Sequence, residues 1–169
     1  MKPEGKVNLI IEMQNKYGYN VFIETGTNYG YTLEKVHKHF KHNISIEIQK
    51  HYHDRAKEVF AGKNIDLRLG DSAVVLPMIV DKLKEPAIFW IDAHYSARDN
   101  IKPPVDEELS AIMSSNYPHV VLIDDARLFD EKADTYLSEF PTVNKIIEKM
   151  SSRFDCNVDN DIIICLPKT

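Results

Sequence analysis

The residues best suited to chemistry near the start of the chain form one turn, Glu24-Thr25-Gly26-Thr27-Asn28-Tyr29-Gly30. An apolar β-type run precedes this turn, and a helix-forming segment follows it. Gly26 and Gly30 let the backbone turn tightly and approach a ligand without a Cβ clash, and Glu24 offers an acceptor for a cationic amino group or for hydroxyls. A strand that turns into a helix in this way is where α/β proteins hold a nucleotide-like cofactor. A plain strand–helix turn is the alternative for so short a motif.

Two further polar positions extend this pattern. Glu47 lies 21 residues after Gly26, at the expected end of the next strand. An acid there can accept hydrogen bonds from both hydroxyls of a ribose, and the alternative is an acid that faces water. Asp71 and Ser72 follow the third expected strand, where they could meet an adenine amine, although capping of the next helix explains them equally well.

Three carboxylates follow two neighbouring strands. Asp92 ends the fourth expected strand, and Asp124 and Asp125 end the fifth. Like charges that converge repel one another, so this cluster needs a divalent cation, a bound proton or a cationic ligand. Hard oxygen ligands suit Mg²⁺, Mn²⁺ or Ca²⁺ rather than zinc. The alternative is that Asp124 faces the pocket while Asp125 caps the following turn.

His94 lies two residues after Asp92 and has the chemistry of a general base near neutral pH; a structural histidine is the alternative. The other histidines show no metal-ligand spacing. The chain has no Gly-Lys-Ser/Thr phosphate loop and no Gly-x-Ser-x-Gly elbow, so P-loop and hydrolase functions are disfavoured.

The elements that must position these residues alternate between apolar strands and helical segments, which predicts an α/β fold with a parallel sheet covered on both faces. We expect Asp71 or Ser72 to cap a helix that has Pro77 in its first turn and continues to about Lys84. The expected strands are Val21–Thr25, Asn43–Ile48, Ile65–Leu69, Ala87–Ala93 and His119–Ile123, the other expected helices are Val7–Lys16, Tyr31–Phe40, Gln49–Phe60, Glu107–Ser115 and Pro141–Met150, and a terminal antiparallel hairpin joins Phe154–Val158 to Asp161–Leu166 through Asp159-Asn160.

Size and composition predict one domain over 1–169, with an N-terminal helix in 1–18 and the hairpin in 154–167. The formal net charge of −5 argues against a nucleic-acid partner, and the basic residues of Lys35–Arg55 are spread along two expected helices. No signal-like segment or membrane-length apolar run occurs, so a cytoplasmic protein without a membrane partner is expected. Cys156 and Cys165 are expected to be reduced core residues, because the expected hairpin register does not place them opposite each other.

Over essentially its whole length the chain resembles the class I S-adenosylmethionine (SAM)-dependent methyltransferases. The resemblance rests on Glu24-x-Gly26-x-x-x-Gly30, Glu47, Asp71-Ser72, Ile91-Asp92 and the terminal hairpin. It implies a doubly wound three-layer sandwich with a mostly parallel seven-stranded sheet in the order 3-2-1-4-5-7-6. It also implies that the cofactor is SAM. The implied contacts are Glu24, Gly26, Thr27 and Gly30 with the methionine part, Glu47 with the ribose, and Asp71 and Ser72 with the adenine; Asp92 also belongs to the expected cofactor site.

Ile91-Asp92-Ala93-His94 and Ile123-Asp124-Asp125 also resemble the metal-dependent O-methyltransferases of the catechol and macrolide-sugar type. That resemblance implies a Mg²⁺ ion at Asp92, Asp124 and Asp125 that orients the acceptor oxygens. Ser96 stands at about the place of the lysine base of the catechol enzymes, so His94 or Asp92 would take the catalytic role. The implied reaction is in-line attack of an acceptor oxygen on the sulfonium methyl.

The predicted function is therefore methyl transfer to a hydroxyl of a small molecule, such as a sugar or a polyhydroxylated natural product. Asn28 stands where a third glycine is frequent in the resembled family. The chain has few segments with which to enclose an acceptor. A small acceptor, an open site completed by another subunit of a homo-oligomer, or loss of catalysis would each fit this feature. Two alternatives remain: a non-catalytic subunit that binds a cofactor or a partner, and an NAD(P)-dependent oxidoreductase.

Overall fold

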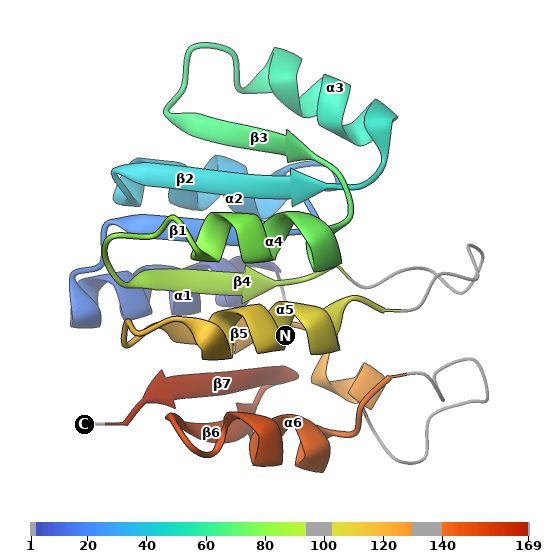
Figure 1. The fold of residues 1–169 in the computed structure, drawn as a ribbon. Helices are drawn as coiled ribbons and strands as arrows, with labels where there is room; N and C mark the ends of the chain where they lie inside the picture. The colour runs from blue at the N-terminus through green and yellow to red at the C-terminus, as the bar shows by residue number, and fades with distance from the viewer. Residues whose placement is uncertain (1–2, 94–102, 130–139, 169) are drawn as a thin grey trace.

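The computed structural model describes residues 3–93, 103–129 and 140–168. Its centre is a seven-stranded sheet in the order β3-β2-β1-β4-β5-β7-β6 (Figure 1). This order and the α/β fold class confirm the prediction. The strands are β1 (Val21–Thr25), β2 (His42–Glu47), β3 (Ile65–Leu69), β4 (Ala87–Ile91), β5 (Val120–Ile123), β6 (Phe154–Asp159) and β7 (Ile162–Pro167).

Strands β1 to β5 pair in parallel, and β7 runs antiparallel to both β5 and β6. The central strands β1, β4 and β5 are buried along their whole length. Their sequences are nearly continuous apolar runs, as expected for strands that are covered on both faces. Because the parallel strands end at the same edge, the acidic residues that follow them are brought to one edge of the sheet.

Helices cover both faces of this sheet. On one face α1 (Pro3–Tyr17), α2 (Tyr31–Val36) and α3 (Lys50–Val59) pack against Phe22, Trp90 and Leu122. On the other face α4 (Ser72–Val80), α5 (Val105–Ser114) and α6 (Val143–Met150) pack against alternate residues of the same strands, such as Ile23, Phe89 and Ile123. The alternation of side chains along each strand thus produces two separate cores. Two short 3₁₀ segments, η1 (His37–His39) and η2 (Ala126–Phe129), complete the described elements.

The helix α4 differs from its prediction. It ends at Val80 rather than near Lys84, and Pro77 lies inside the helix rather than in its first turn. A proline there removes one backbone donor, and the helix ends within one further turn. The predicted cap is confirmed, because the Asp71 carboxylate accepts a hydrogen bond from Ala73 N at 2.9 Å.

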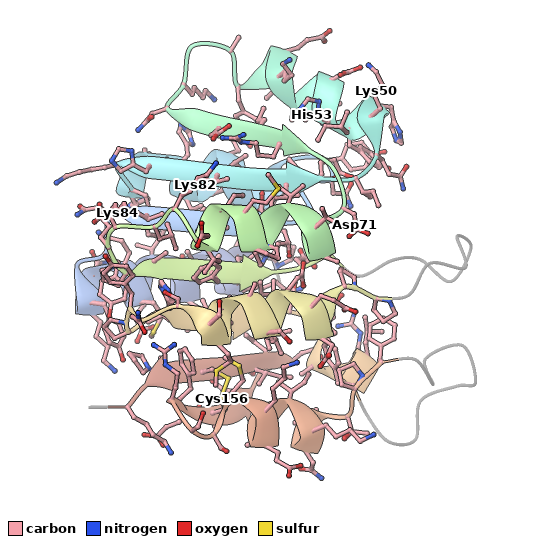
Figure 2. The ribbon with its side chains drawn as sticks, viewed as in Figure 1. Lys50, His53, Asp71, Lys82, Lys84 and Cys156 are labelled. Carbon is pink, nitrogen blue, oxygen red and sulfur yellow. A yellow bond between two sulfur atoms is a disulfide. The ribbon has the colours of Figure 1, made fainter. Side chains whose placement is uncertain are left out.

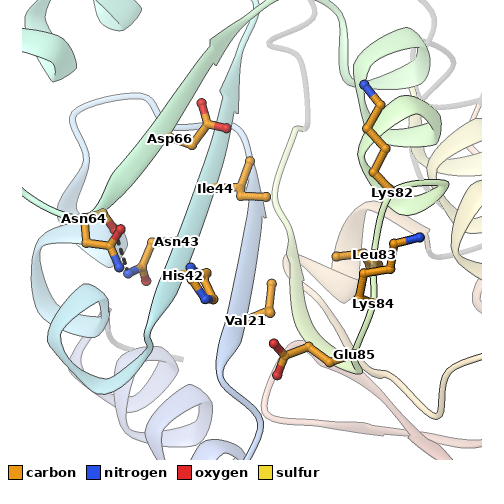
Figure 3. Close-up of a pocket in the computed structure, with 10 residues that line it drawn as sticks. All are labelled: Val21, His42, Asn43, Ile44, Asn64, Asp66, Lys82, Leu83, Lys84 and Glu85. Carbon is orange, nitrogen blue, oxygen red and sulfur yellow. Dashed lines mark hydrogen bonds between the residues drawn. The ribbon is translucent and has the colours of Figure 1, made fainter.

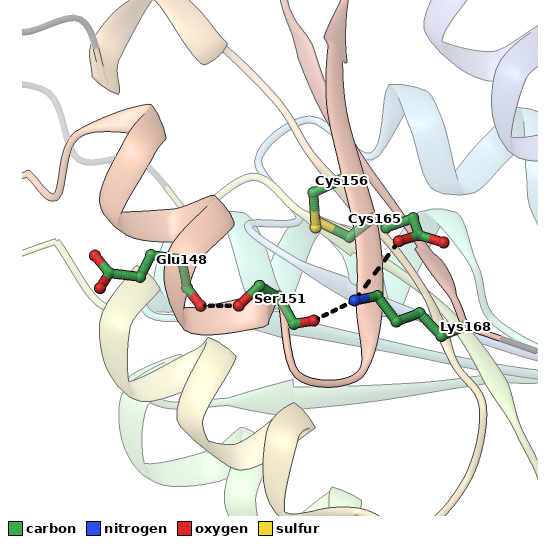
Figure 4. The surroundings of a disulfide bond; sticks show 6 residues. Glu148, Ser151, Cys156, Cys165 and Lys168 are labelled. Carbon is green, nitrogen blue, oxygen red and sulfur yellow. Dashed lines mark hydrogen bonds and ion pairs between the residues drawn. A yellow bond between two sulfur atoms is a disulfide. The ribbon is translucent and has the colours of Figure 1, made fainter.

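The prediction for the cysteines was wrong. Cys156 and Cys165 face each other across β6 and β7, 4.1 Å apart between their Cα atoms, and form a disulfide (Figure 4). The turn consists of Asn160 and Asp161, both with positive φ, rather than of Asp159 and Asn160. A shift of the turn by one residue moves every cross-strand partner by two, so the expected register would have placed Cys156 opposite Ile163.

Within the described ranges, no helix combines the length and the apolar character that a membrane span requires.

Candidate functional site

The turn between β1 and α2 has the backbone that its glycines predicted. Gly26 has a φ of 85°, and a Cβ at this position would lie 2.5 Å from the carbonyl oxygen of Asp92. Gly30 also has a positive φ, of 76°. Asn28 has a φ of 48°, a left-handed conformation that asparagine tolerates better than most residues. The asparagine in place of a third glycine is therefore compatible with the turn.

Glu24 lies at the bottom of this turn with only 2% of its surface exposed. In the sheet register it is opposite Ser45 of β2, and the Ser45 hydroxyl donates to Glu24 Oε2 at 2.6 Å. Ser45 Oγ is also 2.6 Å from Thr27 Oγ1, so three side chains form one buried chain of polar groups. Burial raises the pKa of Glu24 to about 8, against the Ser45 hydrogen bond, and the charges of Asp92 and Glu47 raise it further. Near neutral pH this carboxyl requires either a proton or a cationic ligand.

Glu47 at the end of β2 is held by backbone donors. Its Oε2 accepts from Asn28 N at 2.7 Å, and its Oε1 accepts from Gln49 N at 2.8 Å. The glycine turn and the start of α3 therefore fix the orientation of this carboxylate. Each carboxylate oxygen has a second lone pair, which is available for a ligand hydroxyl.

A buried acid that was not predicted, Glu108 of α5, lies near the residues after β3. Burial raises the pKa of Glu108 to about 7, while the hydroxyls of Ser72 and Thr25 favour its charged form and Asp71 and Glu107 oppose it. The hydroxyls of Ser72 and Thr25 lie near Glu108 without forming a hydrogen bond to it. Both Glu108 carboxyl oxygens and Ser72 Oγ lack a hydrogen-bond partner in the described part of the chain. Asp71, the neighbour of Ser72, lies at the edge of the sheet where the parallel strands end (Figure 2).

The three predicted acids of β4 and β5 do converge. Each of Asp92, Asp124 and Asp125 offers an oxygen that lies within 4.8 Å of those of the other two. Lys6 of α1, which sequence reasoning missed, reaches this cluster, with its Nζ 2.5 Å from Asp124 Oδ2 and 3.4 Å from Asp125 Oδ1. The cluster therefore contains a cation that belongs to the chain.

The acids of this cluster do not share one environment. Burial raises the pKa of Asp92 to about 8; Asp124 and Asp125 raise it further, and Lys6 lowers it. Asp124 is 2% exposed, and its backbone N–H donates to Ile91 O. Asp125 has a φ of 54° and directs Oδ1 to Arg127 Nη1 at 2.9 Å. The alternative was that Asp124 faces the pocket while Asp125 caps the following turn. Asp125 Oδ1 also lies 3.4 Å from Lys6 Nζ, so both acids belong to the cluster.

Arg127 holds the turn after β5 in place. Its Nη1 also bonds to Asp161, and its backbone N–H donates to Asp161 Oδ1 at 2.9 Å. The terminal hairpin therefore supports the acidic edge through its turn residue. His94 and Ser96, which the sequence placed beside this edge, fall in 94–102, outside the described residues.

A cavity of about 300 Å³ lies at the opposite edge of the sheet, where the strands begin (Figure 3). Exposed charged side chains line much of it, among them Asp66, Lys82 and Lys84. Ligands of open α/β sheets bind at the carboxyl ends of the strands, and the buried acids are at that other edge. The cavity therefore adds nothing to the site.

Comparison with known proteins finds likeness in structure alone. No protein-family model and no curated protein matches the sequence. An O-methyltransferase from Bacillus cereus, solved in complex with SAH, superimposes with a TM-score of 0.70 at 16% identity over 99% of this chain and 82% of that one. The O-methyltransferase TomG from Streptomyces achromogenes, involved in tomaymycin synthesis and solved with SAM, gives 0.69 at 16% identity over 98% and 80%. The 23S rRNA methyltransferase ErmE gives 0.64 at 15% identity over 100% and 70%. At this identity the likeness is one of fold, and it extends from O-methyltransferases to an rRNA methyltransferase.

Proposed function

For a chain with the fold of the class I SAM-dependent methyltransferases, we propose that the function is transfer of a methyl group from SAM to an oxygen of a small molecule. The observation that carries the proposal is the buried carboxyl of Glu24 beneath the glycine turn, because a carboxyl at this depth takes either a proton or a cationic ligand. The amino acid end of SAM carries an ammonium group that meets this requirement. A dinucleotide would instead bring a pyrophosphate, which an acid at this position repels.

Different residues of the chain would bind different parts of the cofactor. Glu24 and the backbone of Gly26 would hold the methionine part, Glu47 would accept the ribose hydroxyls, and Asp71 with Ser72 would contact the adenine. The position of Asp71 at the edge where the parallel strands end supports this assignment (Figure 2). Bound SAM would supply the sulfonium methyl for in-line attack by an acceptor oxygen; the S–CH3 bond would break to leave the thioether product, and the hydroxyl proton would pass to a carboxylate of the site or to water. The residues of the site contribute mainly orientation and exclusion of water.

The predicted Mg²⁺ is not part of this proposal. Asp92, Asp124 and Asp125 suit a hard divalent ion in donor type and spacing. The ammonium of Lys6 already lies among them, so the cluster as the chain presents it does not fit an added ion. No step of the proposed reaction passes through a metal.

We propose a small hydroxylated acceptor, such as a sugar or a polyhydroxylated natural product. The two O-methyltransferases of similar structure support the oxygen acceptor, and the net charge of −5 argues against nucleic acid. A second copy of the chain would complete the acceptor side of the site.

Calorimetric titration with SAM, its demethylated product and NAD tests the cofactor. We expect both sulfur compounds to bind and NAD not to bind. Binding of NAD without either sulfur compound would overturn the proposal in favour of an oxidoreductase. Binding of SAM without turnover on a panel of hydroxylated acceptors would favour the alternative of a non-catalytic subunit.

A further inference from the structure

The first helix brings a single cation into the acidic cluster. Lys6 Nζ lies 2.5 Å from Asp124 Oδ2 and 3.4 Å from Asp125 Oδ1. The side chain of Asp124 is 3% exposed and that of Lys6 is 19% exposed. The oxygens of the cluster lie within 4.8 Å of one another, so the ammonium is close to the position that a shared metal ion would need.

The element that carries Lys6 is fixed to the body of the protein. Val7, Ile10 and Met13 of α1 are buried in the core between this helix and the sheet. Lys6 directly precedes Val7, so the core packing determines where its side chain begins. A tethered ammonium is present at a constant high local concentration. A dissolved cation must compete with it for the same oxygens.

Part of the acidic charge of the site is also neutralised without an added ion. Arg127 pairs with Asp125 at 2.9 Å and also bonds to Asp161. Two side-chain cations, Lys6 and Arg127, thus contact the carboxylates that follow β5. A divalent ion placed among the same oxygens would be repelled by the ammonium of Lys6, strongly so in a partly buried site.

We propose that Lys6 is the resident cation of the cluster formed by Asp92, Asp124 and Asp125, in place of a divalent metal. The inference concerns the site of the proposed function and rests on it only for the consequence that methyl transfer proceeds without a metal. Lys6 is then a positioning residue, because it holds Asp124 and Asp125 in the arrangement that the acceptor meets.

Titration with Mn²⁺, followed by the electron paramagnetic resonance signal of the free ion, tests the proposal. We expect the wild-type chain to leave the signal unchanged at millimolar Mn²⁺. The variant Lys6→Met should bind Mn²⁺ about tenfold or more tightly, because the carboxylates lose their competing charge. Lys6→Arg should behave as the wild type, and Lys6→Met combined with Asp124→Asn should lose the gained binding. Lys16→Met, a change of an exposed lysine in the same helix, is the matched control and should gain nothing.

Three results would overturn the proposal. They are tight Mn²⁺ binding by the wild type, equal binding by the wild type and Lys6→Met, and no binding by a folded Lys6→Met. If Lys6→Met does not fold, Lys6→Gln, which also removes the charge, takes its place with the same expected gain in binding, and micromolar binding by the wild type or Lys6→Arg contradicts a resident ammonium. Calorimetry with SAM on the same samples reports separately on the proposed function, so failure of one does not imply failure of the other.

Discussion

At the scale of single residues, the main chemical feature of this protein is a set of buried acids whose hydrogen bonds and neighbouring cations do not offset the cost of burying a charge. Burial raises the pKa values of Glu24 and Asp92 to about 8 and that of Glu108 to about 7. Such shifts gather at functional sites more often than elsewhere. The sequence predicted Glu24 and Asp92 because they directly follow apolar strands. It did not predict Glu108, since an acid in the first turns of a helix is also explained by the helix dipole.

The side chain of Glu108 is buried, with 1% of the residue exposed. Burial raises the pKa of Glu108 from 4.5 to about 7, so between these values the folded state binds more protons than the unfolded state. The free energy of unfolding should therefore fall as the pH rises from 4.5 to 7, by roughly 3 kcal/mol at most. Urea unfolding across this range should show the loss in the wild type. Glu108→Gln should reduce it, and an equal pH dependence in both proteins would contradict the assignment.

At the scale of elements, the turn between β1 and α2 was predictable from its residue types. Gly26 and Gly30 are at positive φ, as the motif requires. The close approach of Gly26 to the carbonyl of Asp92 could not be predicted, because it depends on how far β4 extends beside β1. The turn is thus locked to the neighbouring strand end rather than simply flexible.

Gly26 and Gly18 have similar φ angles, 85° and 68°, but different surroundings. Gly26→Ala would place a Cβ 2.5 Å from the carbonyl oxygen of Asp92, whereas Gly18→Ala at a φ of 68° would meet nothing within 4 Å. Gly18→Ala should cost only the left-handed strain, about 1 kcal/mol. Gly26→Ala should cost at least about 2 kcal/mol more, because the strand end must move. Chemical denaturation measures both, and equal losses would show that the close approach does not constrain the turn.

At the scale of the whole molecule, the alternation of apolar strands and helices was sufficient to predict the layers, and the resemblance added the strand order. The acidic edge followed from the same reasoning, because parallel strands end together. Two long-range features could not be predicted. Lys6 is one of two lysines in α1, and no spacing connects it to residues 118 and 119 positions later. The hairpin register depended on which of two adjacent turn-forming pairs, Asp159-Asn160 or Asn160-Asp161, makes the turn.

In the proposed function Glu24 receives the cationic amino acid end of SAM, and proton-linked calorimetry measures this event. Near pH 7 the free protein holds a proton on Glu24, since burial raises the pKa of this group to about 8. Binding of a cation should favour the carboxylate and release that proton, so the measured enthalpy should depend on the ionisation enthalpy of the buffer. The affinity should rise as the pH approaches 8.

Glu24→Gln should abolish the proton release and weaken SAM binding roughly tenfold to a hundredfold, through loss of a charged hydrogen bond. Glu34→Gln, a change of an exposed acid in α2, should alter neither. The same affinity and the same buffer dependence in Glu24→Gln as in the wild type would contradict the assignment of this site to SAM.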